Sequence, residues 1–288
     1  MIFASTTIRK ILAALAVVLS FACIHDARAD ESLSIYGLKG YGFVISPEVS
    51  TGTHVQGSVL YSRFNGKIEN RDGYVVATPL SLTHGSDGLW EVAVATDWES
   101  WENTDFDESE SGLGDVFAGG KVRLLGRNKK DPLDLSLMPY ILIPGGNHDK
   151  SIGDLYNFNP SPEDDFSYGA NLLLGKRVGR FYLTGNLGIN YLDTDLDYLE
   201  DNAVFAGVAL EYHISESLMA YAEYFGTENK NDLECDPCFD KDVNDDMSEL
   251  GAGLVYIRQR WGFRVHGGTG LTDTTPNFRL LASINRGF

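Results

Sequence analysis

The stretch at residues 278–288 reads F-R-L-L-A-S-I-N-R-G-F. Successive side chains of a β-strand point to opposite faces, and here one face is apolar and the other polar. The apolar face holds Phe278, Leu280, Ala282, Ile284 and Phe288. The polar face holds Arg279, Ser283, Asn285 and Gly287, with Leu281 and Arg286 out of step. This pattern is typical of the strand that closes a transmembrane β-barrel, although a soluble sheet also produces it.

The N-terminus predicts export. Arg9 and Lys10 precede an apolar run at residues 11–22, and Ala27-Arg28-Ala29 forms a small-x-small cleavage pattern. These features identify residues 1–29 as a secretory signal peptide. No later stretch holds the roughly 18 consecutive apolar residues of a membrane helix. The exported chain therefore either stays soluble or enters a membrane as a closed barrel, which satisfies its backbone in lipid.

The charge balance limits the partners. The chain has 23 basic and 41 acidic residues, a formal net charge of −18. So acidic a protein is unsuited to nucleic acid, whose phosphates require Lys and Arg. We therefore expect no nucleic-acid partner. The length of the chain after removal of the predicted signal peptide suits one large domain.

Alternation with period two recurs along the chain. In the clearest segment, 180–192, Leu183 and Leu187 share one face, and Thr184 and Asn186 share the other. About twelve segments have the roughly 9–11 residues that a tilted membrane strand needs. They are 55–64, 73–83, 90–98, 112–126, 133–143, 166–178, 180–192, 204–212, 217–227, 249–256, 262–271 and 278–288.

The connections alternate between short turns and longer acidic loops, except for the short 271–277. Outer-membrane barrels have short periplasmic turns and longer external loops. We predict an all-β protein whose residues 54–288 form a transmembrane antiparallel up-and-down β-barrel in the cell outer membrane. Residues 30–53 are expected to be either a periplasmic segment or a plug of the lumen. Arg286, near the periplasmic end, should extend to lipid headgroups.

Three motifs add a family resemblance. They are Gly112-Leu-Gly-Asp-Val116 with its continuation at 121–125, Pro139-Tyr-Ile-Leu-Ile-Pro144-Gly-Gly, and Gly270-Leu-Thr-Asp-Thr-Thr-Pro276. With them, residues 55–288 resemble outer-membrane proteins associated with the meta-pathway of phenol degradation, which are often labelled as transporters. Gly145 replaces the Thr that the family commonly has. The resemblance implies passage of small aromatic or apolar compounds and no catalytic residues.

A set of charged side chains falls opposite the predicted lipid face. A Lys or Arg on the lipid face would cost about 2–4 kcal/mol at the membrane midplane, so this set must point inward. It forms either a polar conduit that selects the solute or the filling of a narrow barrel. The candidate lumen-lining, solute-binding residues are Glu91, Asp97, Asp115, Lys121, Arg123, Asp134, Tyr140, Glu211, Glu223, Glu249, Arg264, His266 and Arg279.

Two loop motifs raise the question of disulfides and metals. Cys235 and Cys238 form a C-x-x-C pair flanked by acids, and in an exported protein a structural disulfide is favoured over a redox pair. A zinc site would need two further ligands. Residues 240–246 resemble the start of a calcium loop, but Asp245 and Gly251 stand where Gly and Glu are required. We predict no metal and no cofactor.

Catalysis is the least favoured role. Nucleophilic catalysis needs a Ser near an oriented base, and the candidates are His213 with Ser215 or Ser217, and His266 with Ser283. No G-x-S-x-G stretch is present. We predict that the protein is not an enzyme, with a barrel lipid hydrolase as the remote alternative.

The predicted function is therefore an outer-membrane channel or transporter for small, apolar or aromatic molecules, by passive or facilitated diffusion. The main alternative is a barrel without transport that has a structural or surface-interaction role. The expected partners are outer-membrane lipid and lipopolysaccharide, a small-molecule solute, and the barrel assembly machinery through residues 278–288. The acidic loops at 99–110 and 228–246 are hypothesised to share divalent ions with lipopolysaccharide.

Overall fold

The computed structural model describes part of the chain. The described residues are 32–67, 71–86, 88–104, 108–127, 131–145, 166–192, 202–229, 247–272 and 275–288. The predicted signal peptide, the Cys235 and Cys238 pair and residues 240–246 lie outside them.

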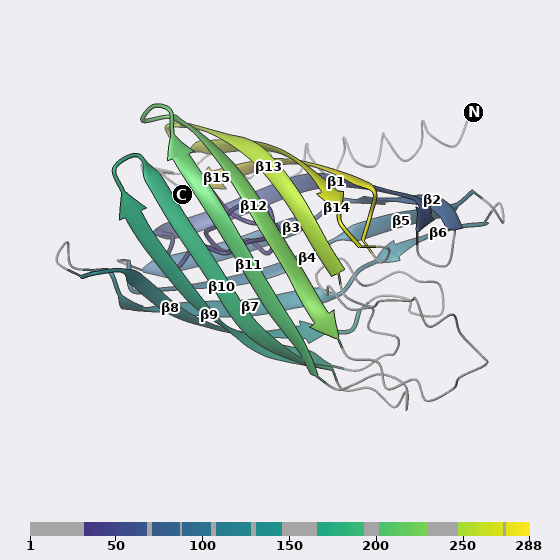
Figure 1. Cartoon of the computed structure of the whole chain (residues 1–288), viewed down its shortest axis with the longest axis horizontal. Coiled ribbons are helices and arrows are strands. Elements are labelled where there is room, and N and C mark those ends of the chain that lie inside the picture. The colour runs from purple at the N-terminus through teal and green to yellow at the C-terminus, as the bar shows by residue number, and fades with distance from the viewer. Residues whose placement is uncertain are drawn as a thin grey trace.

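The fold is a single antiparallel sheet that closes on itself (Figure 1). The first half of the chain supplies β1 (Gly52–Lys67), β2 (Arg71–Ala77), β3 (Leu80–Ser86), β4 (Trp90–Thr96), β5 (Trp98–Asn103), β6 (Glu108–Leu113), β7 (Val116–Leu125) and β8 (Asp134–Ile143). The second half supplies β9 (Ser167–Val178), β10 (Phe181–Leu192), β11 (Asn202–His213), β12 (Leu218–Asn229), β13 (Met247–Arg258), β14 (Trp261–Gly270) and β15 (Phe278–Gly287). β15 pairs with β1 from His54↔Gly287 to Arg63↔Phe278, which closes the ring.

Three barrel strands are each interrupted once. β2 and β3 are separated by Thr78 and Pro79, and Pro79 cannot donate to the ladder because it has no N–H group. β4 and β5 are separated by Asp97, and β6 and β7 by Gly114 and Asp115. When each pair is counted as one strand, the barrel has twelve strands. The predicted fold class is confirmed.

Two predicted loops are largely strand. β1 continues to Lys67, and β5 and β6 pair from Trp98↔Leu113 to Asn103↔Glu108 within the predicted connection 98–112. The prediction of a loop at 98–112 was wrong because the side chains of β5 do not divide regularly into a buried and an exposed face. The burial of β5 alternates only at its start, and residues 100–102 are all half-buried. The backbone ladder can continue where the apolar alternation ends.

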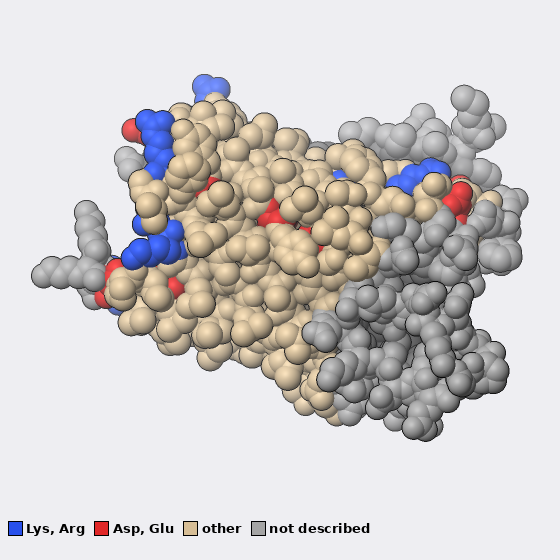
Figure 2. All heavy atoms as spheres, viewed as in Figure 1, with Lys and Arg blue, Asp and Glu red and all other residues tan. Residues whose placement is uncertain are grey.

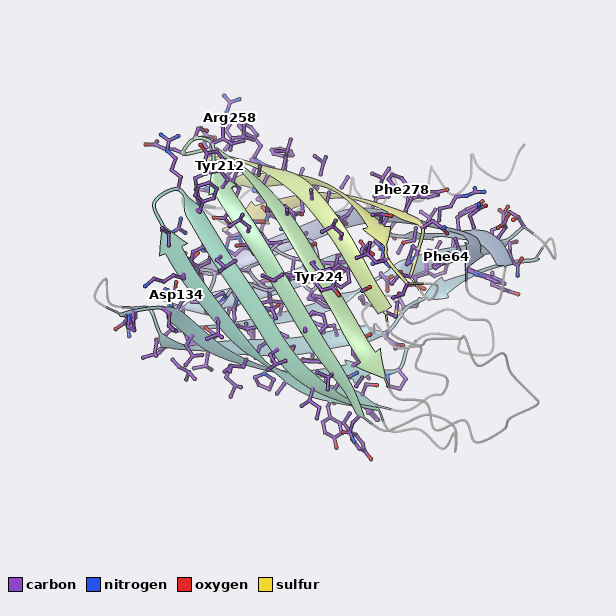
Figure 3. The ribbon with its side chains drawn as sticks, viewed as in Figure 1. Phe64, Asp134, Tyr212, Tyr224, Arg258 and Phe278 are labelled. Atoms are coloured by element: carbon purple, nitrogen blue, oxygen red, sulfur yellow. The ribbon has the colours of Figure 1, made fainter. Side chains whose placement is uncertain are left out.

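The outer face of the barrel is an apolar belt. Leu187 is 59% exposed, Ile189 54% and Val265 58%, while inward neighbours such as Thr184 are fully buried. Figure 2 shows a mostly uncharged surface over the barrel wall, with a few Asp and Glu atoms visible in it; most Lys and Arg lie at the end that carries the short turns, and a smaller group lies at the opposite end. Tyr212, Tyr224 and Phe278 project from the same outer face (Figure 3). So large an exposed apolar surface is suited to lipid. Among the described residues, no helix is long and apolar enough to span a membrane.

Replacing Leu187 with Arg tests this belt. Leu187 lies in the middle of β10, so a lipid-facing guanidinium there is expected to lower the free energy of unfolding by about 2–4 kcal/mol. The matched control is Val178→Arg, on an outward residue beside the short turn after β9, where the cost should fall to about 0–1 kcal/mol. Urea unfolding in lipid vesicles measures both. Equal losses for the two variants would contradict the assignment of the belt.

Arg286 does lie next to aromatic rings at the short-turn end. Its guanidinium is 5.1 Å from the ring centroid of Trp261 and 5.3 Å from that of Phe288. A cation held over aromatic rings is common at a membrane interface, where both groups reach the headgroup level. The position is consistent with the predicted contact with headgroups, which stays a prediction.

Candidate functional site in the barrel lumen

Residues 32–51, the inner segment, lie against the inward-facing side chains of the wall. Leu33, Ile35, Leu38 and Phe43 are completely buried, and Tyr41 is 1% exposed. The segment has little regular structure, and its bridges are Leu33↔Lys39 and Gly40↔Ile45. Several of its backbone N–H groups donate within the segment, such as Ile35 to Gly42 at 3.0 Å and Tyr41 to Val44 at 2.9 Å. The other buried polar groups of its backbone need partners on the wall.

A buried ion pair of the wall supplies many of these partners. Lys121 Nζ lies 2.7 Å from Glu91 Oε1, and both side chains are fully buried. Lys121 also donates to the carbonyl oxygens of Lys39 (3.2 Å) and Ser46 (2.5 Å). Glu91 accepts from the N–H of Lys39 (2.9 Å) and from the N–H and hydroxyl of Ser50 (both 2.5 Å). The pair is therefore satisfied only when the inner segment is in place.

Glu223 on β12 forms a second anchor. Its carboxylate accepts from the N–H of Phe43 (3.1 Å) and the N–H of Val44 (3.0 Å). His266 Nδ1 lies 3.7 Å from the same carboxylate. Gly42 makes this approach possible, because a Cβ there would lie 2.3 Å from Glu223 Oε1.

Rings of the inner segment pack against rings of the wall. The centroids of Tyr36 and Phe117 are 5.1 Å apart, those of Tyr41 and Tyr221 5.2 Å, and those of Phe43 and Phe225 4.7 Å. Tyr140 extends the first group, with its ring 5.9 Å from Phe117. Arg279 lies 4.8 Å from the ring of Phe43 and 3.3 Å from Glu249. Aromatic contacts and one cation–π contact thus join the segment to the wall.

Neutral polar side chains complete the contact. Asn186 bonds Ile45 in both directions, accepting from its N–H (2.8 Å) and donating to its carbonyl (2.7 Å). Thr83 donates to the carbonyl of Gly37 (2.6 Å). The sequence prediction missed these residues because it selected mainly charged side chains. Their inward position in the alternation was the signal that could have found them.

The predicted residues near the short turns form a separate group. Arg123 lies 2.5 Å from Asp134, which also accepts from the hydroxyl of Tyr182 at 2.7 Å. Glu211 lies 2.5 Å from His213. This group neighbours the inner segment through Arg177, which stacks on the ring of Tyr182 at 4.7 Å and lies 3.6 Å from Glu48.

Asp97 and Asp115 stand apart, at the interruptions of the barrel strands. Both are buried, and Asp115 accepts from the N–H of Gly145 at 3.0 Å. No group of three or more His, Cys, Asp or Glu residues in the described ranges is arranged to hold a metal ion.

The predicted lumen-lining set is therefore placed inside the barrel, but it is not gathered into one site. Arg123, Asp134 and Tyr140 are partly exposed. The buried members are Glu91, Asp97, Asp115, Lys121, Glu211, Glu223, Glu249, Arg264, His266 and Arg279. Contact with a solute stays a prediction.

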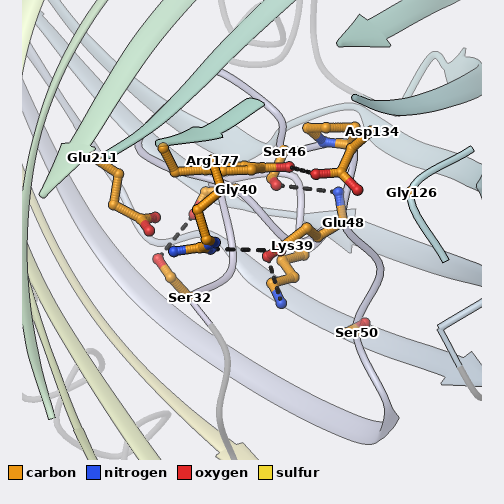
Figure 4. Close-up of polar contacts among 12 residues, drawn as sticks. Ser32, Lys39, Gly40, Ser46, Glu48, Ser50, Gly126, Asp134, Arg177 and Glu211 are labelled. Carbon is orange, nitrogen blue, oxygen red and sulfur yellow. Dashed lines mark hydrogen bonds and ion pairs between the residues drawn. The ribbon is translucent and has the colours of Figure 1, made fainter. Parts of the chain in front are cut away.

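Glu48 makes the stability of the protein depend on acid. Its carboxylate lies 3.2 Å from Lys39 (Figure 4). The Lys39 ammonium lowers the pKa of Glu48 from 4.5 to about 2.

The expected result is a pH-dependent stability that Glu48→Gln weakens. A carboxyl with a depressed folded-state pKa contributes its full stabilisation above its ordinary pKa. That contribution should be lost as the pH falls from about 4.5 towards 2. Unfolding midpoints of wild type and Glu48→Gln in this window measure it. Lys39→Met should weaken the same dependence and leave the part that Arg177 supplies. Parallel pH profiles for all three proteins would contradict the assignment.

A closed antiparallel barrel with an apolar outer belt and a charged interior defines a membrane-spanning β-barrel protein. The family described as "Putative MetA-pathway of phenol degradation" matches residues 46–285, and the chain belongs to this family. The resemblance predicted from the three motifs is confirmed.

Solved outer-membrane proteins share the fold. An outer membrane channel of the COG4313 group from Pseudomonas putida F1 is 13% identical, with a TM-score of 0.64 over 87% of this chain and 100% of that one. The NanC porin is 12% identical, with a TM-score of 0.50 over 82% of this chain and 98% of that one. The KdgM porin is 9% identical, also at 0.50, over 82% and 99%. No curated protein sequence matches this chain. The shared fold agrees with the predicted outer-membrane location.

Proposed function

We propose that this protein is an outer-membrane channel for small molecules of apolar or aromatic character, which cross by passive or facilitated diffusion. The observation that carries the proposal is that the lumen is filled by a segment that belongs to no wall strand. The lumen holds residues 32–51, which are outside the barrel ladder apart from the link to β1. A filling of this kind can move while every wall strand stays paired. In this proposal the inner segment acts as a plug.

The aromatic preference rests on the contacts between plug and wall. The wall rings of Phe117, Tyr221 and Phe225 each face a ring of the inner segment. A planar aromatic solute can replace such a ring at the same distance and in the same tilted arrangement. The meta-pathway family to which the chain belongs is in keeping with this solute class.

Planar-bilayer recordings of the full-length protein test the channel. We expect ionic conductance that benzyl alcohol reduces in a concentration-dependent manner and that glycerol at the same concentration leaves unchanged. Conductance without any effect of benzyl alcohol would remove the aromatic preference. Failure to conduct, with a folded barrel verified by its different migration before and after boiling, would instead favour the barrel without transport.

The contacts of the candidate serines and histidines favour a protein without hydrolase chemistry. His266 is hydrogen-bonded to the hydroxyl of Tyr221 at 3.2 Å, and Ser283 accepts from Ser58 at 2.9 Å. Ser215 caps the turn before β12 by accepting from the N–H of Leu218. Nucleophilic catalysis would need one of these serines to donate to a histidine.

Two partners belong to the same proposal. β15 forms the seam with β1, which makes it the strand through which the assembly machinery would hold an unclosed barrel. The acidic stretches at 99–110 and 228–246 would share divalent ions with lipopolysaccharide phosphates. Unchanged loop proteolysis and heat stability after removal of divalent ions would contradict the second contact.

A further inference from the structure

Arg264 on β14 differs from the other inward-facing basic residues. Lys121, Arg123 and Arg279 each form an ion pair with a carboxylate, at 2.7, 2.5 and 3.3 Å. Arg264 is 4% exposed, and Glu223 acts on its charge from a distance. Within the described ranges, no carboxylate forms an ion pair with Arg264 at 4.0 Å or less. A buried guanidinium is costly unless its charge is compensated.

The hydrogen bonds of Arg264 are also incomplete. Its Nη2 donates to the hydroxyl of Ser32 and to the carbonyl oxygen of Gly40, the latter at 3.1 Å. Its Nε and Nη1 are buried and have no acceptor among the residues that the structure describes. Both acceptors that it does have belong to the inner segment. With the inner segment in place, the N–H donors on Nε and Nη1 of the guanidinium therefore stay unused.

The residues in register with Arg264 on the neighbouring strands are of two kinds. The strand register places Arg264 opposite Ser283, and Ser283 opposite Ser58, so two buried hydroxyls follow it across β15 and β1. On the other side the register places Val255 and then Met219, which are 2% and 8% exposed. The inner wall thus offers a cation and hydroxyls beside a small apolar surface.

We propose that Arg264 is the binding site for the carboxylate of a small organic anion with an apolar or aromatic body. A carboxylate accepts two parallel N–H bonds from a guanidinium, and such charge-assisted bonds are about twice as strong as neutral ones. The apolar body would lie towards Val255 and Met219. This inference deepens the proposed channel function, on which it rests, by naming the charge of its solute.

Binding at Arg264 is thereby linked to movement of the inner segment. The carboxylate competes with Ser32 and Gly40 for the same guanidinium, so it binds better when these residues have moved away. A ligand shifts a two-state equilibrium by its difference in affinity for the two states. An organic anion would therefore favour the displaced inner segment, whereas an uncharged solute of the same size would have no such effect through Arg264.

Titration calorimetry of the folded, full-length protein in detergent at neutral pH tests the site. The probes are benzoate and benzyl alcohol, which share a ring and differ in charge. We expect benzoate to bind wild type and to lose affinity by about tenfold or more in Arg264→Gln, because a charged hydrogen bond is replaced by a neutral one. Arg264→Lys should retain part of the affinity, since it keeps the charge without the fork geometry.

The matched control is Arg258→Gln, the same change at an exposed position beside the turn after β13, and it should bind benzoate as wild type does. Equal affinity of wild type and Arg264→Gln for benzoate, or absence of benzoate binding to wild type, would overturn the inference. The channel proposal is tested separately, because it is the absence of ionic conductance that would contradict it. Migration before and after boiling verifies that each variant is folded.

Discussion

Replacing Lys121 with Met is expected to destabilise the filled barrel by about 3–5 kcal/mol, because it removes one partner of a buried ion pair and leaves the other charge uncompensated. Glu91 is fully buried and lies 2.7 Å from Lys121 in the native protein. The carbonyl oxygens of Lys39 and Ser46 lose their shared donor in the same step. Displacement of the inner segment lets water reach Glu91, so we expect this segment to leave the lumen before the wall unfolds.

Two measurements separate release of the segment from loss of the barrel. Conductance in planar bilayers should rise, while the boiled and unboiled forms should still migrate differently. The double variant Lys121→Met, Glu91→Gln removes both charges and keeps an acceptor, so most of the lost stability should return. Lys176→Met removes an exposed ammonium from β9 and should have little effect. A conductance of Lys121→Met equal to that of wild type would contradict the role of the pair.

A single methyl group at Gly42 is expected to have a comparable effect. Its Cβ would lie 2.3 Å from Glu223 Oε1 and 3.1 Å from His266 Cε1. To make room, the carboxylate of Glu223 must give up the N–H groups of Phe43 and Val44. Overpacking costs about 1–3 kcal/mol, and each buried N–H left without an acceptor costs about 1–3 kcal/mol more. Gly42→Ala should therefore weaken binding of the inner segment and raise conductance.

The matched control for Gly42→Ala lies on the barrel wall. A Cβ at Gly185 of β10 would meet no atom within 4 Å, so Gly185→Ala adds the same methyl group without a clash. Urea unfolding and conductance of the two variants should differ clearly. Identical behaviour would mean that Glu223 can adapt at no cost and that Gly42 does not determine how the segment is seated.

The wall of the barrel was predictable because its signal is local. In β10 and β15, alternate residues must be apolar to face lipid, and a window of about ten residues contains the whole pattern. The inward direction of Glu223 and Arg264 followed from the same alternation. The hairpin of β5 and β6 was not predicted because the side chains of β5 are not divided regularly between two faces.

The position of the inner segment in the lumen could not be predicted in the same way. Phe43 contacts Glu223 across a sequence separation of 180 residues, and Ile45 contacts Asn186 across 141. Neither contact leaves a periodic pattern in the residues around it. The prediction therefore left open whether residues 30–53 lie in the periplasm or in the lumen. Pairing of Gly42 with Glu223 depends on three-dimensional proximity alone.

The order of the chain has a consequence for the rates of folding and unfolding. The inner segment directly precedes β1, yet its partners lie on strands as distant as β12 and β14. Those partners surround it only after β1 has paired with β15. Its contacts should then form after the main folding barrier, and substitutions there should act on the unfolding rate and leave the folding rate nearly unchanged. The inner segment would thus determine how long a finished barrel lasts, while the seam between β1 and β15 determines how quickly one is made.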